Sequence, residues 1–361
     1  MTKKTLIQIV PHLPPQICGV GDYAFCLAKE MFRNYGLRTH FIICDSKWEP
    51  QDSKSTFTYS VLKDQTPEAL VTELNRVFSQ KVVLQLSGYG YDKKRGCPKW
   101  LFEGLRRWKN DTNGKLVLMF HELYVKTYEI WRRSFWHSFQ QRCLVINLGR
   151  ISDEMITNQS GYKEFLDRCV VKKFKKRVYI SPVFSTIGEL CENKGFLTRD
   201  KEAAVFGKER TRANLYDVFG RGFNQTVSSL GIKRIFDIGE GDPSREYDIK
   251  CLRKLGVLPV DEVSYIFSKT MFGFIYYPTG FLSKSSVFAA YASHGIVPLI
   301  PKVCFSKNEN CGLSVGKHFI PVEDVKNCSM QDFERVSKNI YSWYQSHNVK
   351  EQAEKYYGLF S

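Results

Sequence analysis

Residues 272–300 read FGFIYYPTGFLSKSSVFAAYASHGIVPLI and predict a strand, a loop, a helix and a second strand. The run 272–277 is aromatic and apolar without strict alternation, as expected for a strand buried on both faces. Ser283 is a suitable N-cap for a helix over 284–294, and Gly295 stands where a glycine often ends a helix. Such a unit packs as a right-handed parallel crossover.

The loop of this unit opens at the carboxyl edge of the predicted sheet, where open α/β sheets bind ligands. It carries Lys284, Ser285 and Ser286 at the start of the predicted helix. Free backbone N–H groups, hydroxyls and one ammonium group suit a phosphate. We therefore expect these three residues to contribute to a phosphate-binding site.

The same alternation of strands and helices extends in both directions along the chain. It is interrupted over 183–200, a segment of weak periodicity, and a chain of 361 residues is too long for one typical core. We predict an α/β protein of two doubly wound parallel-sheet domains, 1–182 and 183–341, followed by a helical C-terminal segment, 342–361. The polar segment 45–65 is predicted to be an irregular connection.

The positive charge is concentrated in the first half of the chain. The formal net charge is +16, and residues 1–182 hold 30 Lys and Arg against 17 Asp and Glu, whereas the rest hold 23 and 20. The first half should therefore attract nucleic acid, anionic lipid or a phosphorylated substrate. Basic runs beside tryptophans suit a membrane interface, although a solvated face explains any single run. These runs are 93–95, 106–107, 132–133 and 172–177.

Cysteine usage and hydropathy favour a cytosolic protein. Eleven cysteines without a C-x-x-C pair are typical of reduced thiols and support neither a zinc site nor a redox motif. The N-terminal apolar run is too short for a signal peptide, and no apolar window is long enough to span a membrane. We expect a soluble or membrane-peripheral protein.

A glycine-containing loop lies between the first predicted strand and the first predicted helix. Gly19 and Gly21 would let the backbone approach a ligand closely, and Asp22 would cap the helix that follows. The third glycine of a dinucleotide-binding fingerprint is absent. A tight turn with an Asp cap explains the same residues equally well.

Further candidates directly follow predicted strands. His121 comes after the strand 116–120, where it could bind a sugar hydroxyl or act as a base, and a satisfied polar residue is the alternative. Arg210 and Arg212 follow the strand 203–206 and could hold a diphosphate. For these two arginines, a solvated helix start is the alternative.

Five segments together resemble a known family. They are PPQICGVGDYAFCLAKEM, LSGYGYDKKRGCPKWL, MFHELY, SPVFSTIGE and SKSSVFAAYASHGIVPLI, and they extend over nearly the whole chain. In order and spacing they are similar to the bacterial GT-B-fold glycosyltransferases of the group-1, or family-four, type. That family assembles capsule, exopolysaccharide and lipopolysaccharide.

The resemblance implies the GT-B fold, in which two Rossmann-like domains face each other across a cleft. The acceptor would bind to the first domain and a UDP- or GDP-sugar to the second, without a metal or another cofactor, and a C-terminal helix would cross back to the first domain. Gly19 and Gly21 would lie near the donor diphosphate or the acceptor, and His121 and Asp22 would be the catalytic candidates. The resemblance assigns donor binding to Arg210, Arg212, Lys284, Ser285 and Ser286.

The chain departs from the family at one point. Members usually carry two glutamates spaced E-x7-E in the last region, and here Leu282 and Ala290 stand at the corresponding positions. The ribose or sugar contact must therefore be made differently, or the activity is altered or absent.

The sequence thus predicts a metal-independent, hexosyltransferase-type glycosyltransferase of surface polysaccharide biosynthesis. It would be cytoplasmic, peripheral at the inner face of the membrane, and would use a glycan or lipid-linked acceptor. The alternative is a catalytically inactive GT-B-like binding or scaffold protein of a polysaccharide assembly complex. A nucleic-acid partner is not expected, because only charge favours it and no reading motif is present.

Overall fold

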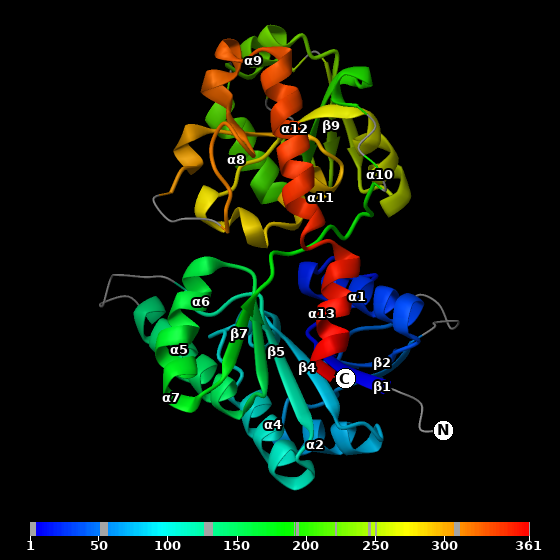
Figure 1. Ribbon diagram of the computed structural model, residues 1–361, viewed down its shortest axis with the longest axis vertical. Coiled ribbons are helices and arrows are strands. Elements are labelled where there is room, and N and C mark those ends of the chain that lie inside the picture. Colours follow the sequence, from blue (N-terminus) through cyan, green and yellow to red (C-terminus); the bar gives the residue numbers. More distant parts are fainter. Residues whose placement is uncertain are drawn as a thin grey trace. The chain divides into compact units, whose positions relative to one another are not determined.

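The computed structural model describes residues 5–50, 57–125, 133–190, 192, 195–220, 222–244, 247–249, 251–306 and 311–360. The predicted basic run 132–133 therefore lies partly outside the described residues. The chain folds into two compact units (Figure 1). Unit 1 comprises Met1–Ser181 together with Val349–Ser361, and unit 2 comprises Pro182–Asn348. The C-terminal segment of unit 1 thus begins at Val349 and not at residue 342.

Unit 1 contains a seven-stranded parallel sheet in the order β3-β2-β1-β4-β5-β6-β7. Its strands are β1 (Thr5–Val10), β2 (Arg38–Ile43), β3 (Thr58–Val61), β4 (Lys81–Leu86), β5 (Lys115–Phe120), β6 (Glu154–Thr157) and β7 (Arg177–Ile180). The chain turns from β1 towards β2 and β3 and later returns to place β4 on the other side of β1. The ends of β1 and β4 therefore form the topological switch point of unit 1, where α/β sheets bind ligands.

Helices cover both faces of this sheet. They are α1 (Gly19–Tyr35), α2 (Pro67–Arg76), α3 (Gly88–Tyr91), α4 (Lys99–Thr112), α5 (Arg133–Ile151), α6 (Ser160–Leu166), the π-helical turn η1 (Asp167–Val171), α7 (Lys172–Phe174) and α13 (Val349–Phe360). The apolar sides of α2, α4 and α5 pack on one face, and α1 packs on the other.

The C-terminal helix α13 packs beside α1, as the red and blue helices of Figure 1 show. The rings of Tyr35 and Tyr357 stack with centroids 4.2 Å apart, and the Tyr23 hydroxyl hydrogen-bonds to Gln352. Lys81 Nζ donates to the carbonyl oxygen of Phe360 at 2.6 Å. The last helix is therefore part of the core of unit 1, although it lies far from α1 in the sequence.

Unit 2 contains a six-stranded parallel sheet in the order β10-β9-β8-β11-β12-β13. Its strands are β8 (Asp200–Phe206), β9 (Arg234–Ile238), β10 (Leu252–Gly256), β11 (Thr270–Phe274), β12 (Val297–Ile300) and β13 (Ile320–Pro321). Its switch point lies between β8 and β11, so both units are doubly wound, as predicted.

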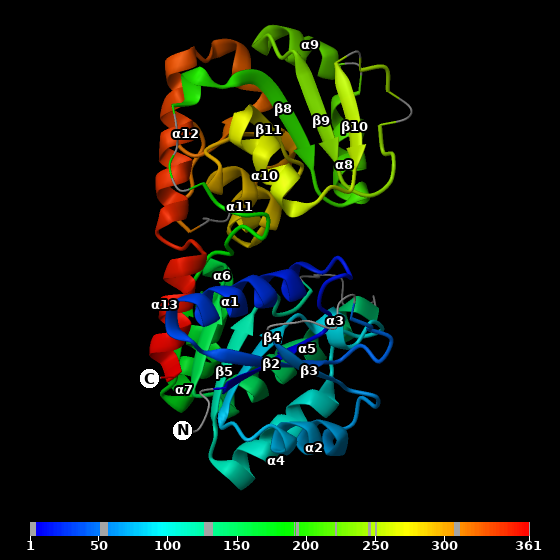
Figure 2. The same ribbon diagram turned by 90° about the vertical axis from the view of Figure 1, so that its right-hand side faces the viewer.

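The helices of unit 2 also cover both faces of its sheet (Figure 2). They are α8 (Glu209–Phe219), α9 (Gly222–Leu230), α10 (Val260–Lys269), α11 (Ser286–Ser293) and α12 (Met330–Gln345), with the 3-10 turns η2 (Phe196–Thr198), η3 (Thr279–Lys284), η4 (Lys302–Cys304) and η5 (Val322–Asn327). On β11, Phe274 packs against rings of α8 and α9, whereas Gly273 faces Tyr291 of α11. A Cβ at Gly273 would stand 2.5 Å from the Tyr291 ring, which explains this glycine inside a strand.

Residues at both ends of helix α11 explain where it begins and ends. The Ser285 hydroxyl accepts the Phe288 N–H at 3.2 Å, so Ser285 is the N-cap. Gly295 has a φ of 62°, its N–H bonds to Ala292 and that of Ile296 bonds to Tyr291, which is a Schellman ending. The predicted end of the helix is confirmed, whereas the predicted start is wrong because η3 occupies the preceding turn and Ser283 is not the cap.

The structure also corrects other sequence predictions. The predicted irregular segment 45–65 contains strand β3, whose residues TYSV are half-exposed or exposed at the sheet edge. The edge strands β10 and β13 and the helix α10 were not predicted either. Helix α1 begins at Gly19 after Cys18, so Asp22 is in its first turn and does not cap it.

Candidate functional site

The switch point of unit 2 is built around two glycines and a buried ion pair. Gly207 follows β8 with a φ of 128°, and Gly239 follows β9 with a φ of 145°. A Cβ on Gly239 would stand 2.2 Å from the carbonyl oxygen of Gly207, so the two loops touch through their backbones. Only glycine tolerates such φ values without strain, and both residues thus fix the shape of this edge.

Arg212 joins these two loops from inside the protein. Only 2% of the residue is exposed, and its guanidinium pairs with Asp237 and donates to the carbonyl oxygens of Gly207 and Glu240. The Tyr216 hydroxyl donates to the same Asp237 carboxylate. The structure therefore gives Arg212 a framework role, and its predicted role as a diphosphate ligand is not supported, because it is buried and each of its three side-chain nitrogens already donates to a protein oxygen.

Arg210 differs from Arg212, although only one residue separates them. Arg210 and Lys208 are exposed at the first turn of α8, directly after β8. Within the described part of the chain, neither side chain makes a hydrogen bond or an ion pair. Helix periodicity explains the difference, because residues two positions apart lie on different sides of a helix. Arg210 remains available to an anion at this edge, together with the positive N-terminal end of α8.

The opposite side of the same switch point carries the three residues predicted around the start of α11. Ser285 is the buried N-cap, and Ser286 is exposed as the first residue of the helix. Lys284 ends η3, and its Nζ lies 5.6 Å from the centre of the Phe281 ring. The structure therefore brings Lys208, Arg210 and the Lys284–Ser286 turn to one edge of one sheet.

The two positions where the resembling family carries glutamates are apolar and inside the core. Leu282 is 0% exposed and Ala290 is 1% exposed. An unpaired carboxylate at either position would be costly to bury. The absence of these acids is therefore consistent with the packing of unit 2 around them.

In unit 1, His121 lies directly after β5 at the carboxyl edge. It is 7% exposed, and its Nε2 lies 2.9 Å from Oε1 of Gln85 at the end of β4. Its ring meets that of Tyr23 edge-on, with centroids 5.0 Å apart. Burial raises the pKa of the Tyr23 phenol well above its usual range, so Tyr23 stays neutral beside the histidine.

His121 ends a chain of buried polar side chains that the sequence interpretation missed. Gln85 Nε2 donates to Gln8 Oε1 at 2.9 Å, and Gln8 Nε2 bonds to the carbonyl oxygen of Ala24 in α1 at 3.4 Å. Because Gln85 presents its carbonyl oxygen to the ring, His121 Nε2 is the donor in that bond. The signal was present in the sequence, since Gln8 and Gln85 are single polar residues inside otherwise apolar strands.

The two glycines at the start of α1 have different surroundings. A Cβ on Gly21 would stand 2.2 Å from the carbonyl oxygen of His12, so the protein's own backbone requires this glycine. A Cβ on Gly19 would meet no atom within 4 Å, so packing does not explain it. Asp22 is half-buried in the same turn, one residue before Tyr23, whose ring contacts His121. The predicted candidates Gly19, Asp22 and His121 therefore lie in one region of unit 1.

The described residues place other polar groups at this edge. Glu122 follows His121 and accepts a hydrogen bond from the Ser87 hydroxyl at 3.1 Å, and Asn158 at the end of β6 bonds to the His121 carbonyl oxygen at 3.4 Å. Among all the residues that the structure describes, no group of three or more His, Cys, Asp or Glu side chains is arranged to hold a metal ion. No described helix is both long and apolar enough to cross a membrane.

Comparison with known proteins gives structural matches but no sequence matches. No model of a protein family matches the chain, and no curated protein matches its sequence significantly. An α-glucosyltransferase in complex with UDP-glucose and DNA containing an abasic site is 12% identical, with 99% of each chain covered and a TM-score of 0.62. A UDP-N-acetylglucosamine 2-epimerase is 12% identical, with 99% of this chain and 97% of that chain covered and a TM-score of 0.58.

A third similar structure is WaaG, described as a glycosyltransferase involved in lipopolysaccharide biosynthesis. It is 9% identical, and the match covers 97% of this chain and 98% of that chain with a TM-score of 0.52. The chain has the GT-B fold. At these identities the likeness concerns the fold alone, because transferases and an epimerase share it.

Proposed function

We propose that this protein is a glycosyltransferase that moves a sugar from a nucleoside-diphosphate sugar to an acceptor. The observation that carries the proposal is the edge of unit 2, where the exposed Arg210 and Lys208 and the start of α11 converge at the switch point of the sheet. Cations and free N–H groups there suit a UDP- or GDP-sugar diphosphate. In this proposal they stabilise the leaving diphosphate without a metal ion.

Unit 1 would supply the acceptor side of the reaction. Asp22 and His121 are the candidates for the groups that orient or deprotonate the acceptor hydroxyl, and Gln85 would hold the imidazole in place. The approach of a ligand to the start of α1 is favoured by Gly19, whose Cβ position is open. Gly21 would support the site only indirectly, through its contact with His12.

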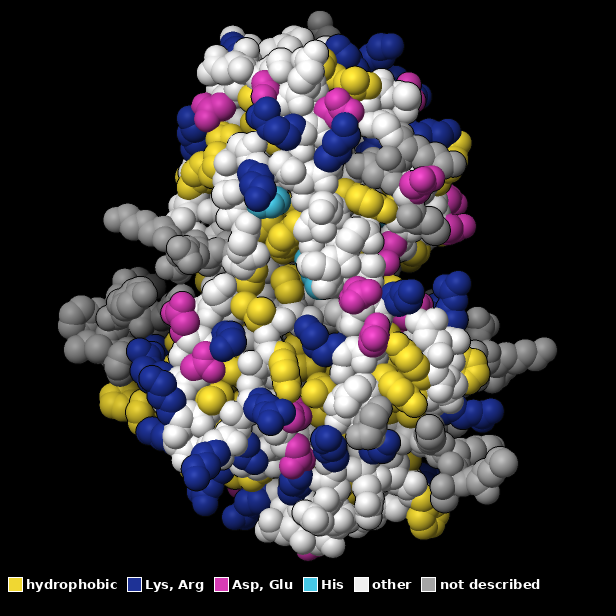
Figure 3. Space-filling model, viewed as in Figure 1, with side chains coloured by type: hydrophobic (Ala, Val, Ile, Leu, Met, Phe, Trp, Pro, Cys, Tyr) yellow, Lys and Arg dark blue, Asp and Glu magenta, His cyan; other side chains and the backbone are white. Residues whose placement is uncertain are grey.

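The surface of unit 1 suits an anionic acceptor or membrane. Its two segments hold 32 Lys and Arg against 19 Asp and Glu, a net charge of +13, whereas unit 2 has +3. Figure 3 shows Lys and Arg side chains spread over the drawn face of this unit. Trp136 and Phe139 are 63% and 58% exposed on α5. These features support an anionic acceptor and a peripheral position at the inner face of a membrane. The lipid-linked or glycan acceptor and the role in surface polysaccharide biosynthesis are proposed from the resemblance of the sequence segments alone.

Transfer and hydrolysis assays with a panel of UDP- and GDP-sugars test this proposal. We expect turnover by the wild-type protein and a loss of roughly 10-fold or more in kcat/KM for Lys284→Ala, since a charge-assisted contact to phosphate contributes about 1.5–3 kcal/mol. Lys233→Ala, at the exposed amino-terminal edge of the same sheet, is the matched control. Absence of turnover with every donor and unchanged donor binding in Lys284→Ala would overturn the proposal.

A catalytically inactive scaffold protein is the second candidate. The apolar, buried residues at positions 282 and 290 favour it, because the acids that the resembling family uses are missing. Donor binding without turnover over a broad acceptor panel, DNA included, would favour this candidate. The DNA arm also tests the expectation that nucleic acid is not a partner.

A further inference from the structure

The loop that follows α3 in unit 1 is held in one shape by hydrogen bonds from its backbone to the Asp92 side chain. Asp92 accepts the N–H groups of Lys94 and Arg95 on Oδ1 at 3.1 and 3.2 Å, and that of Cys97 on Oδ2 at 3.1 Å. A Cβ on Gly88 would stand 2.3 Å from the carbonyl oxygen of Gly96, so the loop lies directly against α3. The residues 92–98 are therefore fixed before any ligand arrives.

Helix α5 holds the same loop from another direction. Gln141 Nε2 donates to the carbonyl oxygen of Arg95 at 2.7 Å, and its Oε1 accepts the N–H of Val125 at 2.9 Å. The backbone of Arg95 is thus tied both to Asp92 and to α5. Its side chain is nevertheless exposed.

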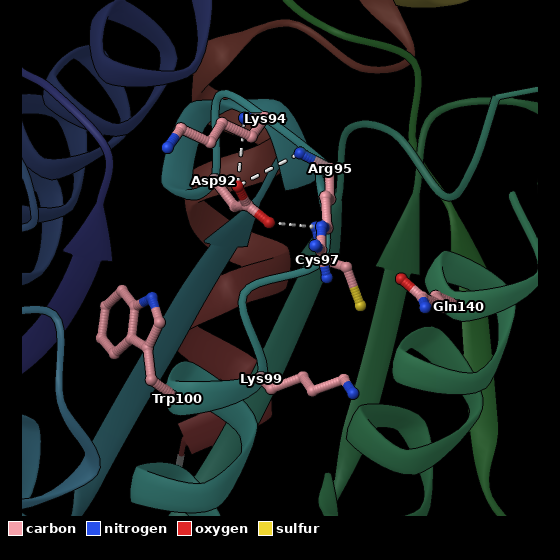
Figure 4. A pocket seen from close by; sticks show the side chains of 7 residues that line it. All are labelled: Asp92, Lys94, Arg95, Cys97, Lys99, Trp100 and Gln140. Atoms are coloured by element: carbon pink, nitrogen blue, oxygen red, sulfur yellow. Dashed lines mark hydrogen bonds between the residues drawn. The ribbon is translucent and has the colours of Figure 1, made fainter. Parts of the chain in front are cut away.

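A pocket of about 380 Å³ opens between this loop, the start of α4 and helix α5 (Figure 4). In the view of Figure 4, Arg95, Lys99 and Gln140 lie on one side of the loop, and Lys94 and Trp100 lie on the other. The lining residues are Asp92, Lys94, Arg95, Cys97, Lys99, Trp100 and Gln140. A pocket of this volume suits a group of the size of a sugar phosphate or a lipid headgroup.

The pocket carries an excess of positive charge. Lys94, Arg95 and Lys99 contribute three cations, and within the described part of the chain their side chains make no hydrogen bond or ion pair. The one carboxylate in the lining, Asp92, already directs both oxygens to backbone N–H groups. On the side of the loop where Arg95 and Lys99 lie, the pocket therefore offers an arginine fork and one ammonium group to an anion on a preformed support.

We propose that this pocket binds a phosphate monoester on the acceptor, either a free sugar phosphate or the headgroup of a lipid. The proposal rests on the proposed glycosyltransferase function. The loop connects β4 to α4 at the carboxyl edge of unit 1, the edge where His121 follows the neighbouring strand β5. A phosphate bound there would position the acceptor beside the candidate catalytic residues.

Calorimetric titration of the full chain with glycerol 3-phosphate tests the pocket, with uncharged glycerol as the negative control. Removing the two cations that lie on one side of the loop, in the double variant Arg95→Gln/Lys99→Gln, should weaken binding roughly 10-fold or more. Lys93→Gln, the neighbouring cation that does not line the pocket, should stay within about 2-fold. Asp92→Ala should also weaken binding because the loop loses its support, whereas purely electrostatic attraction would become stronger.

Sedimentation with vesicles that contain phosphatidic acid, compared with phosphatidylcholine alone, distinguishes the two sources of phosphate. Loss of both vesicle binding and glycerol 3-phosphate binding in the double variant identifies a lipid headgroup, and loss of glycerol 3-phosphate binding with unchanged vesicle binding identifies a soluble acceptor. Unchanged glycerol 3-phosphate binding in the double variant would overturn the proposal. Donor hydrolysis is measured in the same samples to keep the two hypotheses apart. If the protein hydrolyses a donor but the double variant binds glycerol 3-phosphate as tightly as the wild type, only the pocket proposal is contradicted.

Discussion

At the scale of single residues, identical side chains in neighbouring positions have different roles. Gly19 and Gly21 both looked like ligand-approach glycines in the sequence, but only Gly21 is needed by the protein's own packing. Arg210 and Arg212 both looked like diphosphate ligands, but Arg212 is buried in an ion pair with Asp237. Residue type and spacing identified the right segments. Only the atoms around each residue show whether it supports the fold or is available to a ligand.

The two glycines give a matched test. Gly21→Ala should destabilise the protein by about 1–3 kcal/mol, because its Cβ would overlap the backbone oxygen of His12. Gly19→Ala should leave stability unchanged or raise it by up to about 1 kcal/mol, since alanine is the better helix former and no atom is displaced. Urea denaturation measures both values. A large stability loss in Gly19→Ala would contradict the difference between the two sites.

The two arginines give a second matched test. Arg212→Ala should cost about 3–5 kcal/mol of stability, because it leaves the carboxylate of Asp237 buried without its cation. Arg210→Ala should change stability by less than about 0.5 kcal/mol and should instead weaken binding of UDP or GDP. Denaturation and nucleotide titration on the same preparations check both. Equal nucleotide affinity in Arg210→Ala and wild type would remove Arg210 from the proposed donor site.

At the scale of elements, buried strands and helix ends could be read from the sequence, and edge strands could not. The apolar runs of β1, β4, β5 and β11 are enough to predict these strands, because strands covered on both faces carry few polar residues. Strands β3 and β10 have partly exposed residues and polar sequences, TYSV and LRKLG, so no apolar pattern marks them. Their pairing partners, distant in the sequence, hold them in the sheet.

We expect His294, at the end of α11, to make unit 2 sensitive to acid. His294 caps the end of this helix, where its ring nitrogens lie near the Ser264 hydroxyl and the Ala290 carbonyl oxygen. The pKa of His294 is lowered to about 4, chiefly by burial; the Ala290 carbonyl oxygen opposes the shift, and Arg199 adds to it. The folded protein therefore holds His294 neutral at pH values where the unfolded chain protonates it.

The sign of the pH effect follows from this difference. Stability from neutral His294 is present above about pH 6.5 and should be lost as the pH falls to about 4, by roughly 3 kcal/mol in total. His294→Gln should flatten this part of the stability profile, whatever its effect at pH 7. Urea denaturation at pH 7, 5.5 and 4.5 measures the free energy of unfolding of both proteins. Parallel profiles for the variant and the wild type would contradict the assignment.

At the scale of the whole molecule, the uneven charge of the sequence follows the two compact units. Unit 1 carries +13 and unit 2 carries +3, and the C-terminal helix joins unit 1 without changing that balance. Order and spacing of the sequence segments were enough to predict two doubly wound sheets and the GT-B fold. The polar chain Gln8–Gln85–His121 and the cationic pocket beside α4 were not predicted, because both depend on strands and loops that meet only in the folded protein.

The central claim is that unit 2 binds the diphosphate of a nucleotide-sugar, and a crystal structure of the full chain soaked with UDP or GDP tests it most directly. We predict a diphosphate at the carboxyl edge of the unit 2 sheet, with its oxygens within hydrogen-bond distance of Arg210 and of backbone N–H groups at the start of α11. A nucleotide bound only to unit 1, or no nucleotide at concentrations that saturate binding in solution, would contradict the claim.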